Sequence, residues 1–277
     1  LDQNDKGLWG GLLVLGYAKG SFKGDVTEVQ IEGIPAGDTF GLYGGDDDDD
    51  NSGVLKYISI RHGGALLGEG NEINGLTLGA VGRGTVIENV EVVGNVDDGV
   101  EFFGGTVNAS ILLVWAQGDD GLDIDQAYAG TVSNSMVLLG LESDHALEID
   151  GPEGSYEAQF TLNNITLQGD ATTPKGEYAD YRSYAMGTTN NVYAYDFQDS
   201  SDVELDNDDV ADNYNSGELT FGVWEIVLPN GVTDVADIFV NKAENVEVTG
   251  FGDNAKAVDK GSETVGANVS DFDWTYA

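Results

Sequence analysis

One phrase recurs four times in the middle of the chain at nearly constant spacing, and this repeat limits the folds that the chain can adopt. Its copies contain Gly75, Gly99, Gly121 and Ala146 at the matching position, and these positions lie 24, 22 and 25 residues apart. A period of roughly 20–50 residues is typical of solenoids, in which each repeat packs on its neighbours. We therefore expect the chain to form a solenoid.

The residues inside each repeat favour strands over helices. Each repeat holds two or three short runs rich in Val, Ile and Leu, and Gly, Asn and Asp separate these runs. Such runs predict strands joined by turns. No repeat has room for a helix of about ten residues, which excludes leucine-rich, ankyrin and helical repeats. The sequence therefore predicts an all-β parallel β-helix, with coils of about 22–25 residues.

Acidic residues are concentrated in these repeats. Residues 97–150 contain eleven carboxylates and no Lys or Arg. Neighbouring strands lie about 4.8 Å apart, and like charges at that spacing repel by about 1 kcal/mol per pair even in water. A divalent cation would offset this repulsion, and calcium, which accepts roughly six to eight oxygen ligands, is the predicted cofactor. Stacking of the coils predicts two columns, formed by Asp98, Asp120 and Asp144 and by Glu101, Asp123 and Glu148.

Two further acidic runs are candidate calcium sites. Residues 46–50 are five consecutive aspartates, and Asp48, Asp50 and Ser52 match the first half of a calcium loop. Ser59 stands where an EF-hand requires a bidentate glutamate, so a complete EF-hand is excluded and a solvated acidic loop is the alternative. Residues 196–212 form the second run, with poorer periodicity. The candidate metal ligands are Asp46, Asp48, Asp50, Asp97, Asp98, Asp119, Asp120, Asp123, Asp125, Asp144, Glu148, Asp150, Asp206 and Asp208.

The overall charge excludes several classes of partner. Eleven Lys and Arg stand against fifty Asp and Glu, which gives a formal net charge of -39. Such a chain repels nucleic acid and anionic membranes, and it suits a calcium-rich or salty medium. No run of about 18 apolar residues is present, so we expect no insertion into a membrane. The sequence contains no cysteine, so disulfides and thiolate metal sites are excluded. It opens on Leu1 without a signal peptide, which we interpret as a processed or trimmed chain.

Several long motifs resemble one bacterial family. They are Gly-Leu-Trp-Gly-Gly-Leu at 7–12, the segment 52–64 that ends in Ile-Arg-His-Gly-Gly, the segment 71–79, and Asp-Asp-Gly-Val-Glu-Phe-Phe-Gly-Gly within 97–107. The family consists of secreted, often lipid-anchored proteins of marine and gut Gram-negative bacteria. The resemblance implies a right-handed, pectin-lyase-like β-helix located outside the cell or on its outer surface. It also implies that this chain lacks the family's usual first coils, while Phe272-Asp273-Trp274-Thr275 resembles the closing motif.

The repeat becomes less regular after Gly151. We expect the β-helix to cover residues 1–214 and residues 215–277 to form strands and a cap on the last coils. A faint helical pattern at 233–243 is a candidate for that cap. Residues 174–184 are interpreted as an insertion whose aromatic rings could stack on a sugar, although such rings more often cover a coil edge. The candidate ligand-binding residues are Tyr178, Tyr181, Arg182 and Tyr184.

Catalysis is the less favoured interpretation. A hydrolase on a β-helix needs two or three carboxylates, one of them an acid of raised pKa, and Asp98, Asp120 and Asp123 would be the candidates. The Gly-His-Gly and Arg-x-Lys strings of pectin hydrolases do not occur. A lyase needs a Lys or Arg near the carboxylates, and Lys56 and Arg61 are expected several coils away.

These observations favour a calcium-stabilised, secreted or cell-surface β-helix that acts as a structural, adhesive or glycan-binding module without catalysis. Its expected partner is a polysaccharide, a surface partner or another copy of the chain. A self-assembling extracellular fibre or surface-layer subunit is one alternative, because the open end of a β-helix is an unpaired sheet edge. A polysaccharide hydrolase or lyase is the other.

Overall fold

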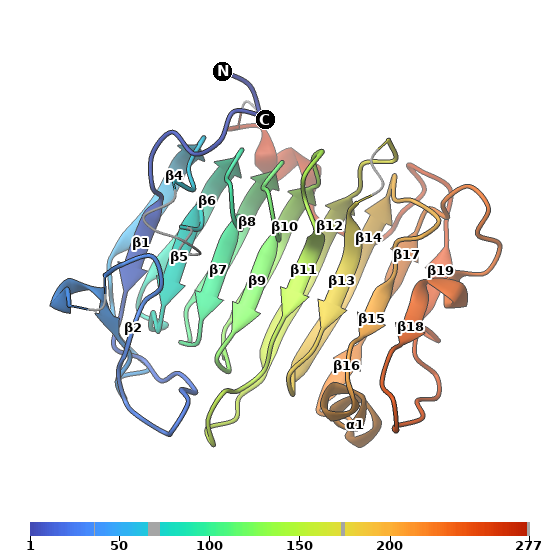
Figure 1. Cartoon of the computed structure of the whole chain (residues 1–277). Coiled ribbons are helices and arrows are strands. Elements are labelled where there is room, and N and C mark those ends of the chain that lie inside the picture. Colours follow the sequence, from blue (N-terminus) through green and yellow to red (C-terminus); the bar gives the residue numbers. More distant parts are fainter. Residues whose placement is uncertain (36, 66–72, 173–174, 276–277) are drawn as a thin grey trace.

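The structure, a computed structural model, describes residues 1–35, 37–65, 73–172 and 175–275. Two long sheets run side by side along the molecule, and the chain winds from one to the other in successive coils (Figure 1). Every pairing within these two sheets is parallel. The fold is a right-handed parallel β-helix, as the repeat and the resemblance predict.

Strands of the two sheets alternate along the chain, so each coil contributes one strand to each. The first, here called the short-strand sheet, contains β1 (Leu12–Leu15), β5 (Leu76–Gly79), β7 (Val100–Phe103), β9 (Leu122–Asp125), β11 (His145–Ile149), β13 (Glu177–Tyr181), β15 (Val203–Leu205) and β18 (Phe239–Asn241). The second, the long-strand sheet, contains β4 (Val54–Arg61), β6 (Val86–Val93), β8 (Asn108–Trp115), β10 (Thr131–Leu138), β12 (Phe160–Gln168), β14 (Gly187–Tyr195), β16 (Leu219–Phe221), β17 (Trp224–Ile226) and β19 (Ala255–Ala257).

In-register stacking builds the core. In the short-strand sheet, Leu76 pairs with Val100, which pairs with Leu122, and all three are buried. Their immediate neighbours point to the opposite face, because successive side chains alternate along a strand. The outer face of this sheet therefore repeats with the same period as the core.

Each long strand bends at one fixed position. The residue at that position has a positive φ in six successive coils, and these residues stack in register: Tyr57, Asn89, Ile111, Asn134, Asn164 and Asn191. A left-handed residue interrupts the extended backbone, so each long strand turns a corner of the coil. Asparagine tolerates this conformation better than most residues, which explains why four of the six are Asn.

An N-terminal excursion packs on the outside of the short-strand sheet. Residues 16–53 carry a hairpin of β2 (Val29–Gln30) and β3 (Leu42–Tyr43), with the 3-10 helix η1 (Thr39–Gly41) between them. The hairpin buries a second small core that contains Phe22, Ile31, Tyr43 and Phe103. It thereby forms a wall beside the outer face of the first coils.

The C-terminal region differs from the expected helical cap. Residues 235–238 form a 3-10 helix, η2 (Val235–Ile238), and the chain then enters β18, because this segment continues the stacking of the short-strand sheet. The α-helix lies earlier, at α1 (Asp208–Ser216), inside the second acidic run. The side chain of Asn207 accepts a hydrogen bond from the backbone N–H of Val210 and so caps its N-terminus. No described helix has the length and apolar character needed to cross a bilayer.

The last described residues run back along the long-strand sheet. The backbone N–H of Asn268 donates to Asn134 Oδ1 at 2.7 Å, and the short helix η3 (Val269–Phe272) follows. The Trp274 ring then meets the Tyr57 ring edge-on, with centroids 6.0 Å apart. The last described part of the chain therefore lies beside the first coil.

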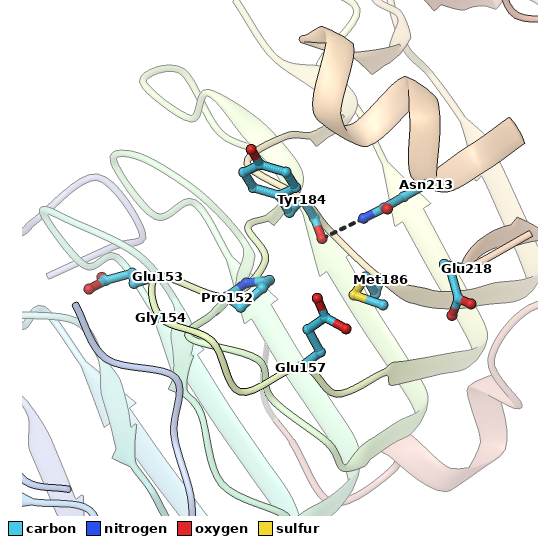
Figure 2. A pocket seen from close by; sticks show the side chains of 8 residues that line it. All are labelled: Pro152, Glu153, Gly154, Glu157, Tyr184, Met186, Asn213 and Glu218. Carbon is cyan, nitrogen blue, oxygen red and sulfur yellow. Dashed lines mark hydrogen bonds between the residues drawn. The ribbon is translucent and has the colours of Figure 1, made fainter. Parts of the chain in front are cut away.

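The predicted insertion at 174–184 is wrong for its described part, residues 175–184; Pro174 lies outside the described residues. This segment contains β13, a regular strand of the short-strand sheet, and both Tyr178 and Tyr181 point into the core with no exposed surface. Neither tyrosine can contact a sugar. Tyr184, in contrast, is 51% exposed and lines a cavity of about 430 Å³ with Pro152 and Met186 (Figure 2).

Replacing Ile111 with Asn is expected to stabilise the protein. A β-branched residue at φ 56° is strained, and asparagine relieves about 1 kcal/mol of that strain. The free energy of unfolding, measured by urea denaturation, should rise in Ile111→Asn and fall in the reverse control Asn164→Ile. If both substitutions changed the free energy of unfolding in the same direction, left-handed backbone conformation would not be what selects the residues of this column.

Candidate functional site

A row of carboxylates follows the outer face of the short-strand sheet. Strand register places one acidic side chain at the same position in five successive coils, and each of them is at most 9% exposed. We call this row the carboxylate ladder. Its members are Glu101, Asp123, Glu148, Asp180 and Glu204. The structure thus brings together the predicted column of Glu101, Asp123 and Glu148 and extends it by two coils.

The other predicted column is wrong at one position. Asp98 and Asp120 do stack, with the backbone N–H of Asp120 donating to Asp98 Oδ1 at 2.9 Å. The next coil, however, places His145 over Asp120, while the N–H of Asp144 donates to the carbonyl of Asp119. The repeat spacing itself gives this pairing, because Gly121 matches Ala146 and the residue before each, Asp120 and His145, must then match as well.

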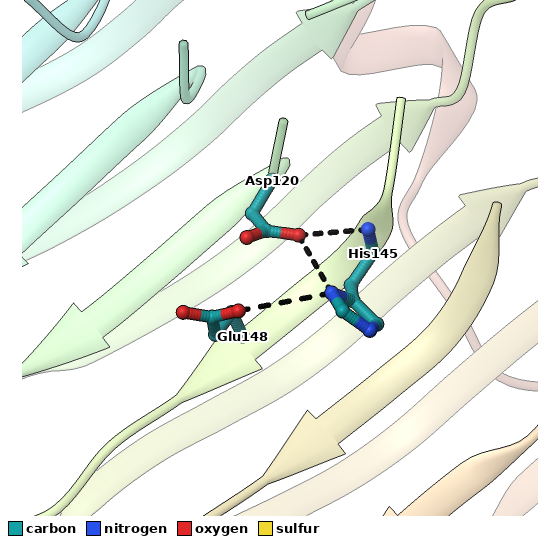
Figure 3. Close-up of side chains that lie close together, drawn as sticks. All are labelled: Asp120, His145 and Glu148. Carbon is teal, nitrogen blue, oxygen red and sulfur yellow. Dashed lines mark hydrogen bonds and ion pairs between the residues drawn. The ribbon is translucent and has the colours of Figure 1, made fainter. Parts of the chain in front are cut away.

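His145 supplies a positive charge to the ladder. Its Nδ1 lies 2.9 Å from Asp120 Oδ1 and 3.7 Å from Glu148 Oε2 (Figure 3). Burial alone would lower the pKa of His145, but the hydrogen bond and charge of Asp120 raise it to about 9. The imidazole is therefore protonated at neutral pH. Burial and the charge of Asp120 raise the pKa of Glu148 to about 9 as well.

Two more basic side chains reach the same half of the ladder. Arg182 Nε donates to Asp150 Oδ2 at 2.6 Å, and its other nitrogens pair with Glu148 and Asp180. Lys242 pairs with Asp202 and Glu204. The expectation that Arg182 lies in an insertion, apart from the carboxylates, is wrong, because β13 places it directly at the end of the ladder strand.

The first two ladder members, Glu101 and Asp123, and the adjacent Asp98 of the other column receive no such compensation; we call these three groups the first half of the ladder. Carboxylate oxygens of Asp98, Glu101 and Asp123 lie within 4.8 Å of one another. Among the ion pairs formed by the described residues, none reaches these three groups. Burial and the neighbouring carboxylates raise the pKa of all three well above its usual range. Asp123 Oδ1 is buried without a hydrogen-bond partner, which leaves a charged or polar group unsatisfied.

A cavity of about 330 Å³ opens over this part of the ladder. Tyr43 and Phe103 line it on the side of the hairpin, and Arg182 lies among the residues that line it from the later coils. Asp123, Asp125 and Glu148 also line it. Burial and the charge of Asp150 raise the pKa of Asp125 to about 7. The cavity therefore presents acidic oxygens, an arginine and two aromatic rings on a rigid sheet.

Comparison with protein-family models identifies the family to which this β-helix belongs. A family model described as a pectate-lyase-like β-helix domain matches residues 1–276. The chain belongs to this family. No curated protein and no solved structure matched the chain.

Other predicted ligands of this pectate-lyase-like β-helix lie apart from the ladder. Asp48 pairs with Lys19 at 3.0 Å and with Arg83 at 3.7 Å, and Asp50 accepts hydrogen bonds from Ser52 and Gly82. Within the described ranges, no group of three metal-ligating side chains includes Asp46, Asp48, Asp50 or Asp144. The structure therefore favours the alternative of an acidic loop, here ordered by basic side chains and backbone N–H groups.

The second acidic run is divided between two roles. Asp206 joins Asp180 and Glu204 in a group of close carboxylates. Asp208 is the first residue of α1 and accepts hydrogen bonds from the backbone and side chain of Asn245, so it joins the helix to a neighbouring loop. Asp202 and Glu204, both in the second acidic run, form another close group with Glu177, which the sequence did not single out.

The alignment of the repeats could have identified Glu177 as a member of this acidic group. Residues 177–181 pair in register with β11, so Glu177 occupies the position of His145 and Asp180 that of Glu148. The tyrosines of β13 hid this match. The earlier repeats carry Gly or Ala at the position of Tyr178, and aliphatic residues or Phe at the position of Tyr181.

The stability of the chelator-treated protein should fall as the pH rises from about 6.5 to about 9. His145 and Glu148 both have raised pKa values, so the folded state binds protons more tightly than the unfolded chain does, and the free energy of unfolding decreases as these protons leave. Urea denaturation across this range measures the effect. Glu148→Gln should flatten the pH dependence, whereas the exposed control Glu247→Gln should leave it unchanged. A stability that rises with pH would contradict these protonation states.

Proposed function

We propose that this β-helix is a secreted or cell-surface binding module in which the first half of the carboxylate ladder holds a calcium ion. One observation carries the proposal: Asp98, Glu101 and Asp123 are buried together without a basic partner, and one Asp123 oxygen has no hydrogen bond. A bound divalent cation would satisfy that oxygen and offset the repulsion among the three carboxylates.

The donor set suits a hard cation. Calcium binds oxygen ligands at about 2.3–2.6 Å, so oxygens on opposite sides of one ion are about 4.8 Å apart. The three carboxylates meet that limit. The site has no cysteine, and its nearest histidine is engaged by Asp120, so ligands preferred by zinc or copper are lacking there.

The setting supports a role outside the cell. Calcium sites of extracellular modules bind with dissociation constants of about 10⁻⁴–10⁻³ M, which match the calcium of external media. The net charge of -39 would keep the protein soluble in such media. The cavity beside the ladder offers a concave surface for a glycan or another surface partner.

Asp123→Asn is expected to abolish calcium binding. In the wild type, calcium at about 100 times its dissociation constant should raise the free energy of unfolding by about 2.7 kcal/mol, and chelation should reverse this. Isothermal titration calorimetry and thermal melts measure the two effects. Asp50→Asn, in the five-aspartate run, is the matched control and should bind calcium as the wild type does. Loss of binding in Asp50→Asn and not in Asp123→Asn would place the ion in the N-terminal loop and refute this site.

A polysaccharide hydrolase is the second candidate, supported by one observation. Asp123 and Glu148 are register neighbours on adjacent strands, and both line the ladder cavity, as the paired carboxylates of a retaining glycosidase would. Glu148, whose pKa is raised to about 9, would be the proton donor. This pair replaces the predicted set of Asp98, Asp120 and Asp123, because Asp98 and Asp120 do not line the cavity.

If this candidate holds, the wild type should release reducing sugars from neutral or acidic polysaccharides. Glu148→Gln should lower the rate by about 10²–10⁴-fold, because it removes general acid catalysis. Glu247→Gln, at an exposed residue that lines neither cavity, is the control. Absence of release by the wild type over a panel of such polysaccharides would rule the hydrolase out and leave the calcium site untouched.

A further inference from the structure

A second cavity lies beside the ladder, at the edge of the coils. The loop after β11 contributes Pro152 and Glu157, the turn after β13 contributes Tyr184 and Met186, and Asn213 reaches it from α1 (Figure 2). Its volume, about 430 Å³, lies in the range of roughly 300–1,000 Å³ that is typical of small-molecule sites. The calcium proposal does not use this cavity.

Tyr184 provides an open aromatic surface in this cavity. Half of its side chain is exposed, although it follows a strand whose other two tyrosines are fully buried. The backbone carbonyl of Tyr184 accepts a hydrogen bond from Asn213 Nδ2 at 2.9 Å, which joins this turn to α1. The faces of the Tyr184 ring suit the C–H face of a pyranose ring, which is apolar.

The charge of the cavity selects among sugars. Glu153, Glu157 and Glu218 line it, and none of the described residues that line it is Lys or Arg. An anionic uronate would be repelled by these carboxylates. An ammonium group would gain both ionic contacts with the carboxylates and a cation–π contact with the tyrosine.

We propose that the Tyr184 cavity binds a sugar that carries a free amino group, such as a glucosamine unit of a deacetylated polysaccharide. The pyranose face stacks on Tyr184, the ammonium group pairs with Glu157 or Glu218, and Asn213 borders the ring. Glu153 lines this cavity and the ladder cavity alike, so a longer chain would continue along the same acidic flank. This proposal rests on the proposed role as a binding module and is independent of calcium.

Isothermal titration calorimetry with a β-1,4-linked glucosamine tetramer tests the proposal, with the fully N-acetylated tetramer and a galacturonate tetramer as comparisons. The glucosamine tetramer should bind, the acetylated one about tenfold more weakly, and the galacturonate one without measurable heat. Binding of the glucosamine tetramer should weaken as salt rises from about 50 to about 500 mM, because its charge is screened.

Variants of the cavity distinguish stacking of the sugar on Tyr184 from non-specific attraction of a cationic ligand to an acidic protein. Tyr184→Ala should weaken binding about tenfold, and Tyr184→Phe should bind as the wild type does, because the ring remains. Glu218→Gln should weaken binding about fivefold. Tyr17→Ala, at a tyrosine that is also exposed but lies outside this cavity, and Glu244→Gln are the matched controls and should bind normally.

Three results would overturn the proposal: equal binding of the acetylated tetramer, wild-type binding by Tyr184→Ala, or equal competition by tetralysine, which has the charge but no sugar ring. Circular dichroism and thermal melts of each variant confirm that the fold is intact. Because calcium binding is measured separately on Asp123→Asn, failure of the sugar site and failure of the calcium site give different results.

Discussion

In-register stacking of parallel coils is the constraint on which the rest of this molecule depends. Each residue of a coil lies over its counterpart at about 4.8 Å, so any side-chain type that recurs in the repeat becomes a column. Inside the coils this produces continuous apolar columns such as Leu76, Val100 and Leu122, which stabilise the fold. On the outer face, the same geometry places carboxylate over carboxylate. Stability and charge repulsion therefore have one origin in this protein.

The N-terminal hairpin, which departs from the repeat, determines how deeply the carboxylate ladder is buried. The N-terminal hairpin packs Tyr43 against Phe103 of β7 and so helps to bury the nearby carboxylates. Burial strengthens repulsion among like charges and, for the same reason, strengthens the attraction for a cation. A ladder of this kind on an open sheet would be screened by water and salt. The wall of the cavity is thus as important to the site as the carboxylates themselves.

Much of the fold, and part of the site, could be predicted from the sequence. The repeat spacing defined the β-helix, and the alternation within each repeat placed Glu101, Asp123 and Glu148 in one column. Sequence reasoning failed in the second column, where the repeat spacing pairs Asp120 with His145 but Asp144 was assigned in its place. It also failed at β13, whose core tyrosines resembled surface aromatics. The coil before β13 is longer than the earlier ones, so the register of β13 depends on how the intervening turns close and not on the residues of the strand alone.

The basic side chains neutralise the carboxylate ladder unevenly along its length. Arg182 forms ion pairs with Glu148, Asp150 and Asp180. Lys242 forms ion pairs with Glu204 and Asp202. A cation at those positions would have to displace a basic side chain that is already held there by its own strand. At Asp98, Glu101 and Asp123 no basic side chain competes among the described ion pairs. The position of Asp98, Glu101 and Asp123 therefore differs in charge from the later ladder positions, although the backbone repeats regularly.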